Sequence, residues 1–288
     1  MPTETVYGLT ARAGDSAAVA RLFEAKGRPR FNPLIVHVAD AEAARRIADL
    51  DERADRLMAA FWPGPLTLVA PYRGARAVCD LARARLDTVA IRVPAHPVAL
   101  ALLQALGEPL VAPSANRSGR PSPTTLAAAV EETGPAAAEA LDGGPCRVGL
   151  ESTVVSLLDG PPRLLRPGSV TRAALKALVG PVAEAEADAA RSPGRSTRHY
   201  APEAPVRLDV LQPRDDELYL AFGPARGQGS GFNLSPAGDL AEAAANLFAF
   251  LRAADSLHPA GIAVAPIPRD GLGEAINDRL ERAAGKIG

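Results

Sequence analysis

The sequence has few of the groups that cross-link a chain or anchor it in a membrane. Its 288 residues include two cysteines, Cys79 and Cys146, which are too few for a disulfide framework and lack the paired spacing of a zinc site. No apolar run approaches the roughly 18 residues that a membrane-spanning helix needs, and no apolar signal region opens the chain. We therefore expect a cytoplasmic protein in a reducing compartment, with no membrane contact.

Excess charge of either sign is also absent. The 32 Lys and Arg residues balance 33 Asp and Glu residues, which excludes a protein that coats nucleic acid by bulk electrostatics. Lysine occurs only at positions 26, 176 and 286, so Lys26 stands out in a chain whose other cations are arginines. Hydrophobic residues make up 47% of the chain, which is enough for a full core.

The common nucleotide and hydrolase fingerprints are missing. The chain has no phosphate-loop motif, no G-x-S-x-G elbow and no zinc-binding helix of two histidines. The glycine-rich run at 227–231 lacks the spacing of a dinucleotide-binding turn. P-loop enzymes and ordinary Rossmann dehydrogenases are therefore disfavoured.

What the chain does contain is an alternation of short apolar runs and helical periodicity. Strands are predicted at 34–38, 65–70, 88–93, 109–112, 153–158 and 163–166. Helices are predicted after Asp15, after Asp40, after His96 and after residues 123–125, where capping residues precede apolar positions at helical spacing. Because several strands follow one another without a helix between them, we predict an α/β fold with a mixed, curved sheet and peripheral helices.

A Pro- and Gly-punctuated stretch divides the chain. We predict a catalytic domain over 1–180, a linker over 181–203 and a small C-terminal α/β, Rossmann-like domain over 204–288. In the last part strands are predicted at 206–210, 217–222 and 261–267, helices at about 239–254 and 272–284, and a loop at 227–231.

Polar segments at the ends of the strands are the candidate site. Lys26 and Arg28 flank a glycine at a predicted helix end, where they can bind a polyphosphate or simply compensate the helix dipole. Arg92 shares a strand face with Thr88, which suits a bound carboxylate or a carboxylate partner within the protein. Ser114 and Asn116 follow a strand, where they can hold a polar ligand or form an ordinary turn.

The other candidates are weaker when taken singly. Residues 2–8 (PTETVYG) place hydroxyls and a carboxylate beside a glycine, and 149–153 (GLEST) and 166–168 (RPG) flank strands. His37 lies in an apolar strand, where a satisfied core histidine is the commoner outcome. Arg198, His199 and Tyr200 form a polar group in the linker, which suggests docking onto another surface.

Taken in order, these segments resemble the YrdC-like threonylcarbamoyl-AMP synthases, in the long form with an additional C-terminal domain. The matching segments are 2–8, 26–29 with 32–34, 63–67, 113–116 with 118–119, 151–153, 166–168, 192–194 with 198–202, and 271–280. Relatives also carry an N-terminal strand before the PTET motif, whereas here Met1 directly precedes it. Either the start codon is assigned too late or a strand is missing, and a missing strand would leave one sheet position open and weaken the anchoring of Thr5.

The resemblance implies a synthase that joins L-threonine, bicarbonate or CO2, and ATP into threonylcarbamoyl-AMP and pyrophosphate. Mg2+ would accompany the ATP, with no metal site of the protein alone. The product would pass to a tRNA threonylcarbamoyl transferase complex, with at most weak contact to tRNA. No covalent nucleophile is needed, so positioning and cations would supply the catalysis.

The resemblance also implies roles for individual residues. Lys26 and Arg28 would be catalytic. L-Threonine would be held by Thr5, His37, Arg92, Ser114 and Ser152. ATP would be held by Lys26, Arg28, Asn32, Thr88, Asn116, Thr124, Arg166, Arg198, His199 and Tyr200, the last three closing the linker over the nucleotide.

Two other functions are weighed against this one. The first is a non-catalytic module that binds double-stranded RNA or tRNA, because Lys26, Arg28, Arg92, Arg117 and Arg166 would form a locally basic face. The second is carbamoyl transfer in a maturation protein, which is less favoured because the acylphosphatase and zinc-finger segments of such proteins are absent. RNA binding that survives Arg92→Ala would support the first, and threonine-dependent pyrophosphate release would support the synthase.

Overall fold

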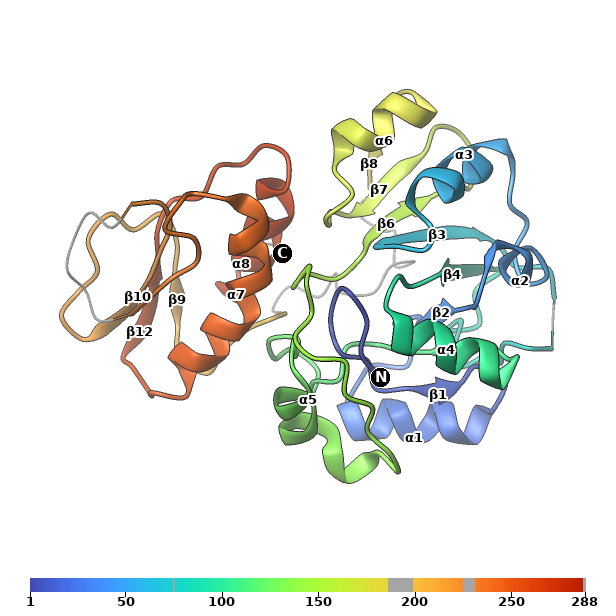
Figure 1. The fold of residues 1–288 in the computed structure, drawn as a ribbon, viewed down its shortest axis with the longest axis horizontal. Coiled ribbons are helices and arrows are strands. Elements are labelled where there is room, and N and C mark those ends of the chain that lie inside the picture. The colour runs from blue at the N-terminus through green and yellow to red at the C-terminus, as the bar shows by residue number, and fades with distance from the viewer. Residues whose placement is uncertain (75, 186–198, 225–230, 287–288) are drawn as a thin grey trace.

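The larger part of the fold is an eight-stranded mixed sheet. The computed structural model describes residues 1–74, 76–185, 199–224 and 231–286. Within them the sheet has the order β1-β5-β2-β4-β3-β6-β7-β8 (Figure 1). Its strands are β1 (Ala11–Arg12), β2 (Ile35–His37), β3 (Leu66–Pro71), β4 (Thr88–Arg92), β5 (Leu110–Val111), β6 (Thr153–Ser156), β7 (Arg163–Arg166) and β8 (Ala183–Glu184).

The predicted mixed sheet is confirmed. β2 runs parallel to β4 and β3 runs parallel to β6, whereas β3 and β4, and β6 and β7, are antiparallel. The short edge strands β1 and β8 were not predicted, because two residues carry no visible alternation. β8 lies beyond residue 180 and still pairs with β7, while 186–198 of the predicted linker fall outside the described residues.

Alternation along the strands separates the two faces of this sheet. Val36 and Ile91 point into the main core together with Leu22, Leu57 and Leu175 from three different helices. The intervening residues Ile35, Val69, Ala90, Val154 and Leu165 form a small separate cluster on the other face. That second face is where the polar ends of the strands can meet a ligand.

Capped helices surround the sheet. They are α1 (Ser16–Lys26), α2 (Ala41–Arg45), α3 (Glu52–Phe61), α4 (Pro97–Leu106), α5 (Leu126–Thr133) and α6 (Arg172–Val179), with a 3-10 turn at Gly134–Ala136. Asp15 and Asp40 accept backbone N–H bonds as predicted, and His96 does so for α4. α1 ends at Gly27 in the left-handed conformation (φ 57°), which a side chain rarely adopts.

The C-terminal part has a smaller sheet of its own. β9 (Val206–Arg207), β10 (Glu217–Ala221), β11 (Gly231–Asn233) and β12 (Gly261–Val264) pair in parallel in the order β11-β10-β12-β9. Helices α7 (Leu240–Asp255) and α8 (Gly273–Ala283) lie on the side that faces the larger sheet (Figure 1). The predicted loop at 227–231 falls mostly outside the described residues, and the Rossmann-like arrangement stays a prediction.

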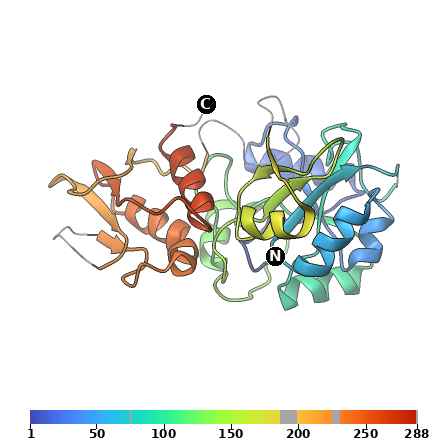
Figure 2. The ribbon, with the colours of Figure 1, turned by 90° about the horizontal axis from the view of Figure 1, so that it is seen from above.

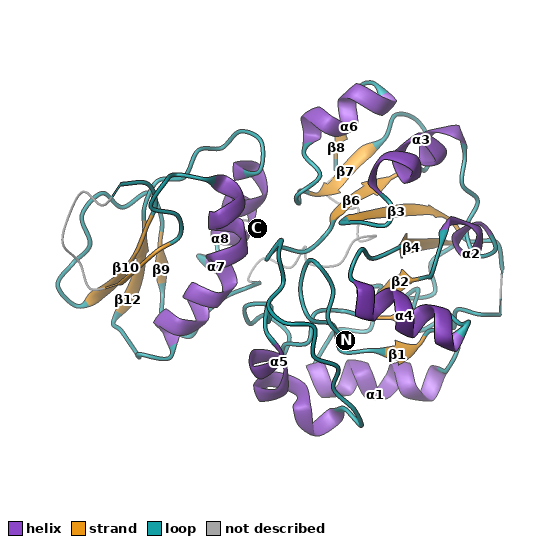
Figure 3. Cartoon of the chain, viewed as in Figure 1, coloured by secondary structure: helices purple, strands orange, loops and turns teal. Residues whose placement is uncertain are grey.

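The two sheets lie side by side in an elongated molecule (Figure 2). Between the C-terminal helices and the larger sheet much of the chain is loop, as Figure 3 shows. A second core cluster contains Leu247 and Ile276 from α7 and α8 together with Val6, Leu150 and Tyr200, so the C-terminal helices pack directly on loops of the larger part. Among the described residues no helix is long and apolar enough to cross a membrane.

Candidate active site

A narrow cavity lies where the strand-end loops of the larger sheet meet the last residues of the predicted linker. Its volume of about 50 Å³ leaves room for only a few water molecules. It is lined by Thr3, Thr5, Val6, Arg28, Leu34, Ile35, His37, Arg92, Ala112, Pro113, Ser114, Glu151, Ser152, Arg166, His199 and Tyr200. All five residues predicted to hold threonine are in this set, as are Arg28, Arg166, His199 and Tyr200.

Three hydrogen bonds within the protein hold the Arg92 side chain in place. Its Nη2 atom donates to the carboxylate of Glu4, its Nη1 atom to the Thr5 hydroxyl at 3.0 Å and its Nε atom to the Gly64 carbonyl at 3.0 Å. These bonds use three of its five N–H groups and leave two for a ligand. The sequence left open whether Arg92 pairs with a carboxylate of a ligand or with one of the protein. In the structure it pairs with Glu4 of the protein.

The PTET turn aligns the hydroxyl of Thr5. The Thr3 hydroxyl donates to the Val6 carbonyl at 2.6 Å, so in its 2.8 Å contact with Thr5 it acts as the acceptor. The Thr5 hydroxyl therefore donates to Thr3 while its oxygen accepts from Arg92. Thr3 and Glu4 were missed as site residues, although their place inside the motif was a usable signal.

His37 is an uncharged member of the cavity wall. The parallel pairing of β2 and β4 places His37 beside Arg92, and the imidazole Nδ1 lies 3.2 Å from the Ile35 carbonyl. Burial, and then the positive charge of Arg92, lower the pKa of His37 to about 3. Its imidazole is therefore neutral at physiological pH, which suits contact with a neutral or polar group.

Lys26 lies behind the cavity rather than in its lining. Its Nζ atom donates to the carbonyl oxygens of Ser114 and Asn116, and its own carbonyl accepts from the Ser118 N–H at 2.8 Å. The side chain thus ties the end of α1 to the loop after β5. Burial, and then the charge of Arg28, lower the pKa of Lys26 to about 7.

Two other arginines face the cavity. Arg28 donates to the carbonyl oxygens of Asn32 and Pro33, at 3.3 and 3.0 Å, and its Nη1 atom has no hydrogen-bond partner among the described residues. Arg166 donates to the Ser152 carbonyl at 2.9 and 3.1 Å and to the Ser152 hydroxyl at 3.2 Å. Burial lowers the pKa of Arg28 to about 10, which still leaves the guanidinium charged at neutral pH.

Glu151 brings the C-terminal part into the cavity wall. Its carboxylate accepts from Arg279 of α8 at 2.9 Å and from the Ser122 hydroxyl. Burial alone would raise the pKa of Glu151, but Arg279, Arg166 and Ser122 outweigh it and the net shift is downward. Glu151 belongs to the 149–153 motif but was not predicted to line the site. Its partner Arg279 lies 128 residues further along the chain, so no sequence pattern indicates the pair.

His199 and Tyr200 close one side of the cavity. Tyr200 is buried with a backbone φ of 60°, a left-handed conformation that is strained for an aromatic residue. Its ring lies 4.0 Å from that of His199 and 5.3 Å from that of Phe248. The Tyr200 hydroxyl and His199 Nδ1 have no hydrogen-bond partner among the described residues, and Arg198 lies outside them.

Some predicted residues do not reach the cavity lining. Thr88 lies at the far end of β4 from Arg92, roughly 13 Å away at about 3.3 Å per residue, and pairs with Pro71. Thr124 is buried and its carbonyl accepts from Cys146. Asn32 and Asn116 lie beside the lining, and each has an Oδ1 atom with no partner among the described residues.

Three of the five cations proposed for RNA binding are buried, although Arg117 is 63% exposed. Lys26, Arg92 and Arg166 are 3 to 5% exposed, so these three cannot reach the phosphates of a duplex. What their region offers instead is a narrow cavity with three guanidinium groups, several hydroxyls and neutral histidines. Such a site can bind a small molecule that carries more than one anionic group. Among the described residues no group of three His, Cys, Asp or Glu side chains is placed to hold a metal.

Comparisons with known proteins agree with this arrangement. Residues 1–168 match the Sua5, YciO and YrdC family, described as "Telomere recombination", and 170–285 match the family described as "Threonylcarbamoyl-AMP synthase, C-terminal domain". Threonylcarbamoyl-AMP synthases of Pyrococcus abyssi and Bacillus subtilis are 42% and 39% identical, over 99% of this chain and 89% and 88% of theirs.

Solved structures of the P. abyssi protein superpose on the whole fold. The structure titled as Sua5 complexed with L-threonine matches with a TM-score of 0.90 and 39% identity, over 99% of this chain and 89% of that one. A variant of that protein with a histidine and the next tyrosine changed to alanine matches with a TM-score of 0.89 and 38% identity, over 99% and 88%.

Proposed function

The chain belongs to the family of threonylcarbamoyl-AMP synthases that have both the Sua5/YciO/YrdC domain and the C-terminal domain, and we propose that its cavity carries out the reaction of that family. The protein is an L-threonylcarbamoyladenylate synthase, a nucleotidyltransferase that uses L-threonine, bicarbonate or CO2, and ATP. The observation that carries the assignment is the meeting of Arg28, Arg92 and Arg166 with strand-end hydroxyls around one narrow cavity. The product serves threonylcarbamoyladenosine modification of tRNA.

The reaction has two bond-forming steps. The threonine amine adds to the carbon of CO2 and loses a proton, which gives a carbamate. A carbamate oxygen then attacks the α-phosphorus of ATP in line, and the bond from that phosphorus to the β-phosphate bridging oxygen breaks as pyrophosphate leaves. Negative charge accumulates on phosphate oxygens in the second step, so fixed cations stabilise its transition state.

Arg92 would bind the threonine carboxylate. Its contacts with Glu4, Thr5 and Gly64 fix the guanidinium plane and leave two N–H groups for a carboxylate. The Ser114 and Ser152 side chains and neutral His37 surround the same cavity and would contact the polar groups of threonine. The site is thus formed before the amino acid binds, which reduces the entropy lost on binding.

Arg28 and Arg166 would bind phosphate groups. Arg28 has an unused Nη1 donor and both side chains border the cavity. Lys26 would add charge from behind the Ser114–Asn116 loop instead of touching the phosphates directly, which differs from the direct phosphate contact implied by the resemblance. The unpartnered Oδ1 atoms of Asn32 and Asn116 would accept from the ribose hydroxyls or the adenine amino group.

His199 and Tyr200 would move when the nucleotide binds. The cavity of about 50 Å³ is far too small for ATP, so the segment that closes it has to shift outward and then settle on the bound nucleotide. The unpartnered Tyr200 hydroxyl and His199 Nδ1 would then find acceptors or donors on ATP. Mg2+ would enter with the triphosphate and screen its charge.

Direct detection of the product tests the function. The purified chain is incubated with ATP, Mg2+, bicarbonate and threonine labelled with carbon-13, and the reaction is analysed by mass spectrometry and by a pyrophosphate assay. We expect an adenylate that carries the label, formed only when all three substrates are present. Pyrophosphate release that does not depend on threonine would contradict the assignment. Transfer to tRNA by a partner complex, and the cytoplasmic location, stay predictions.

A further inference from the structure

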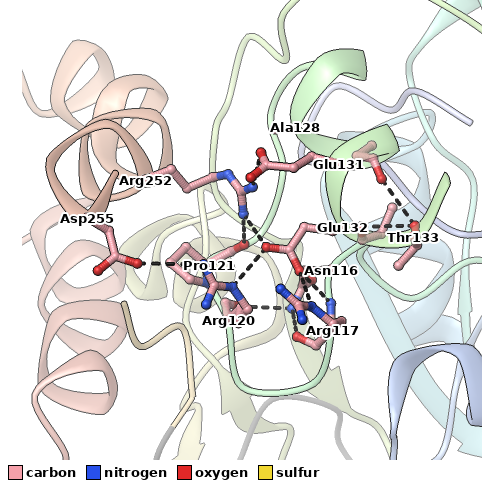
Figure 4. A network of polar contacts seen from close by, with 12 residues as sticks. Asn116, Arg117, Arg120, Pro121, Ala128, Glu131, Glu132, Thr133, Arg252 and Asp255 are labelled. Atoms are coloured by element: carbon pink, nitrogen blue, oxygen red, sulfur yellow. Dashed lines mark hydrogen bonds and ion pairs between the residues drawn. The ribbon is translucent and has the colours of Figure 1, made fainter. Parts of the chain in front are cut away.

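A polar network joins helix α7 to the loop that carries Ser114 and Asn116. Its centre is Glu132 at the end of α5, whose side chain is 2% exposed. The carboxylate accepts from the Arg117 backbone N–H at 3.0 Å, from Arg120 Nε at 3.0 Å and from Arg252 Nη1 at 2.8 Å. Figure 4 shows Arg252 reaching from α7 to Glu132, with Arg117 and Arg120 beside the same carboxylate.

The same helix holds the segment that follows Tyr200. Asp255, one turn after Arg252, accepts from the backbone N–H groups of Glu203 and Ala204 at 2.9 to 3.0 Å. Arg120 also lies 2.7 Å from the Glu203 carboxylate and 3.6 Å from that of Asp255. Two walls of the cavity, one containing Ser114 and the other Tyr200, therefore have their outer sides attached to one turn of α7.

A direct backbone contact joins the two walls. The N–H of Ala201 donates to the Gly119 carbonyl at 2.7 Å, so the residue after Tyr200 is bonded to the loop after Asn116. On the inner side Lys26 bonds the Ser114 and Asn116 carbonyls, and the Asn116 amide bonds those of Arg117 and Arg120. The loop is thus fixed from inside by α1 and from outside by α7.

We infer that Arg252 is a positioning residue, through which the C-terminal part sets the geometry of the nucleotide-binding loop by way of Glu132. This inference rests on the proposed function for the identity of the ligand. Arg252 touches neither the cavity lining nor a proposed substrate contact. The network reaches the loop at residues 117 and 120, next to Asn116, and reaches the other wall next to Tyr200. Asn116 and Tyr200 are both assigned to ATP, whereas Ser114, which is assigned to threonine, lies further from the contacts at 117 and 120 and is held separately by Lys26. We therefore expect the effect on ATP rather than on threonine.

Arg252 allows a matched control. Its Nη2 atom donates to Glu131, a neighbour of Glu132 that is 73% exposed and has no contact with the loop. Glu131→Gln therefore removes one ion pair of the same arginine without touching the loop, and an exposed pair contributes little. Arg252→Met keeps the apolar stem on α7 but removes the bonds to Glu131 and Glu132 and a third bond, from Nη1 to the Pro121 carbonyl at 3.3 Å. Arg252→Lys keeps the charge.

The test measures steady-state kinetics and backbone exchange in the full chain. For Arg252→Met we expect about a tenfold or larger fall in kcat/KM for ATP, with the threonine Kd unchanged within about twofold. Arg252→Lys should recover part of the loss and Glu131→Gln should match wild type. Deuterium exchange at residues 114–121 should be faster in Arg252→Met, because the Arg117 N–H loses a well-held acceptor.

Several outcomes would overturn the inference. One is Arg252→Met with wild-type ATP kinetics and unchanged exchange at 114–121. A second is an equal loss in Arg252→Met and Glu131→Gln, and a third is a lower melting temperature without any change at the loop. If wild type makes no threonylcarbamoyl adenylate, the proposed function fails, and the exchange measurement still decides whether Arg252 holds the loop.

Discussion

The carboxylate of Glu4 and the guanidinium of Arg92 form an ion pair in which both side chains are at most 4% exposed. Breaking such a pair leaves a buried charge without its partner, which is costly, so the pair persists whether or not a ligand is bound. It also determines which N–H groups of Arg92 remain for a carboxylate. The threonine site is therefore built by two segments that are 88 residues apart in sequence.

Arg92→Lys should weaken threonine binding by about tenfold or more. A lysine keeps the charge but cannot span Gly64, Thr5 and Glu4 while still presenting two donors to a ligand. Isothermal titration with L-threonine measures the change. Arg73→Lys is the control, because Arg73 forms an exposed ion pair with Asp49. Unchanged threonine affinity in Arg92→Lys would remove Arg92 from the site.

Lys26 should make ATP binding depend on pH. Its pKa of about 7 is below the usual 10.5 because of burial and Arg28, so the ammonium loses its charge as the pH rises through 7. The ATP phosphates, with a second pKa of about 6, stay ionised above that pH. The attraction between Lys26 and the phosphates therefore weakens because Lys26 loses its charge. ATP affinity measured by titration should fall between pH 7 and 9 in wild type. In Lys26→Met the affinity should be low and flat over this range.

The same shift has a consequence for stability. Between pH 7 and about 10.5 the unfolded chain binds a proton at Lys26 that the folded chain does not, so this group makes unfolding less favourable as pH rises through that window. Replacing Lys26 by methionine removes this contribution. Denaturant midpoints at pH 7 and pH 9 in both proteins measure it, and an identical pH slope would show that Lys26 keeps an ordinary pKa in the folded state.

Sequence patterns located most of the sheet but few of the contacts that form the site. Strands such as Thr88–Arg92 are recognisable because an apolar run carries its own signal. Helix α3 was missed although Asp51 caps it and Leu57 and Met58 are buried at helical spacing, so its signal was present and not used. The partners of Lys26 were not predictable, because only the sheet order brings the carbonyls after β5 to the end of α1.

Tyr200 should contribute to ATP binding through its hydroxyl as well as its ring. Tyr200→Phe keeps the ring packed on Phe248 and His199 but removes a hydroxyl that has no partner among the described residues. We expect a severalfold rise in the ATP Kd with no loss of thermal stability, because no hydrogen bond of the protein is lost. If Tyr200→Phe binds ATP as wild type does, the hydroxyl does not contact the nucleotide and the ring alone closes the cavity.

Arg28 gives the sharpest test of the phosphate site. Arg28→Ala should lower threonine-dependent pyrophosphate release by about 100-fold or more, because a positioned cation stabilises the charge that develops on the leaving phosphates. Arg30→Ala is the matched control, since Arg30 is two residues away on the same loop, is exposed, and does not line the cavity formed by the described residues. Arg28→Lys should retain part of the activity, because it keeps the charge and loses the donors that reach Asn32 and Pro33. If Arg28→Ala and Arg30→Ala both turn over like wild type, the cations that act on the phosphates lie elsewhere, and Arg166 becomes the next residue to replace.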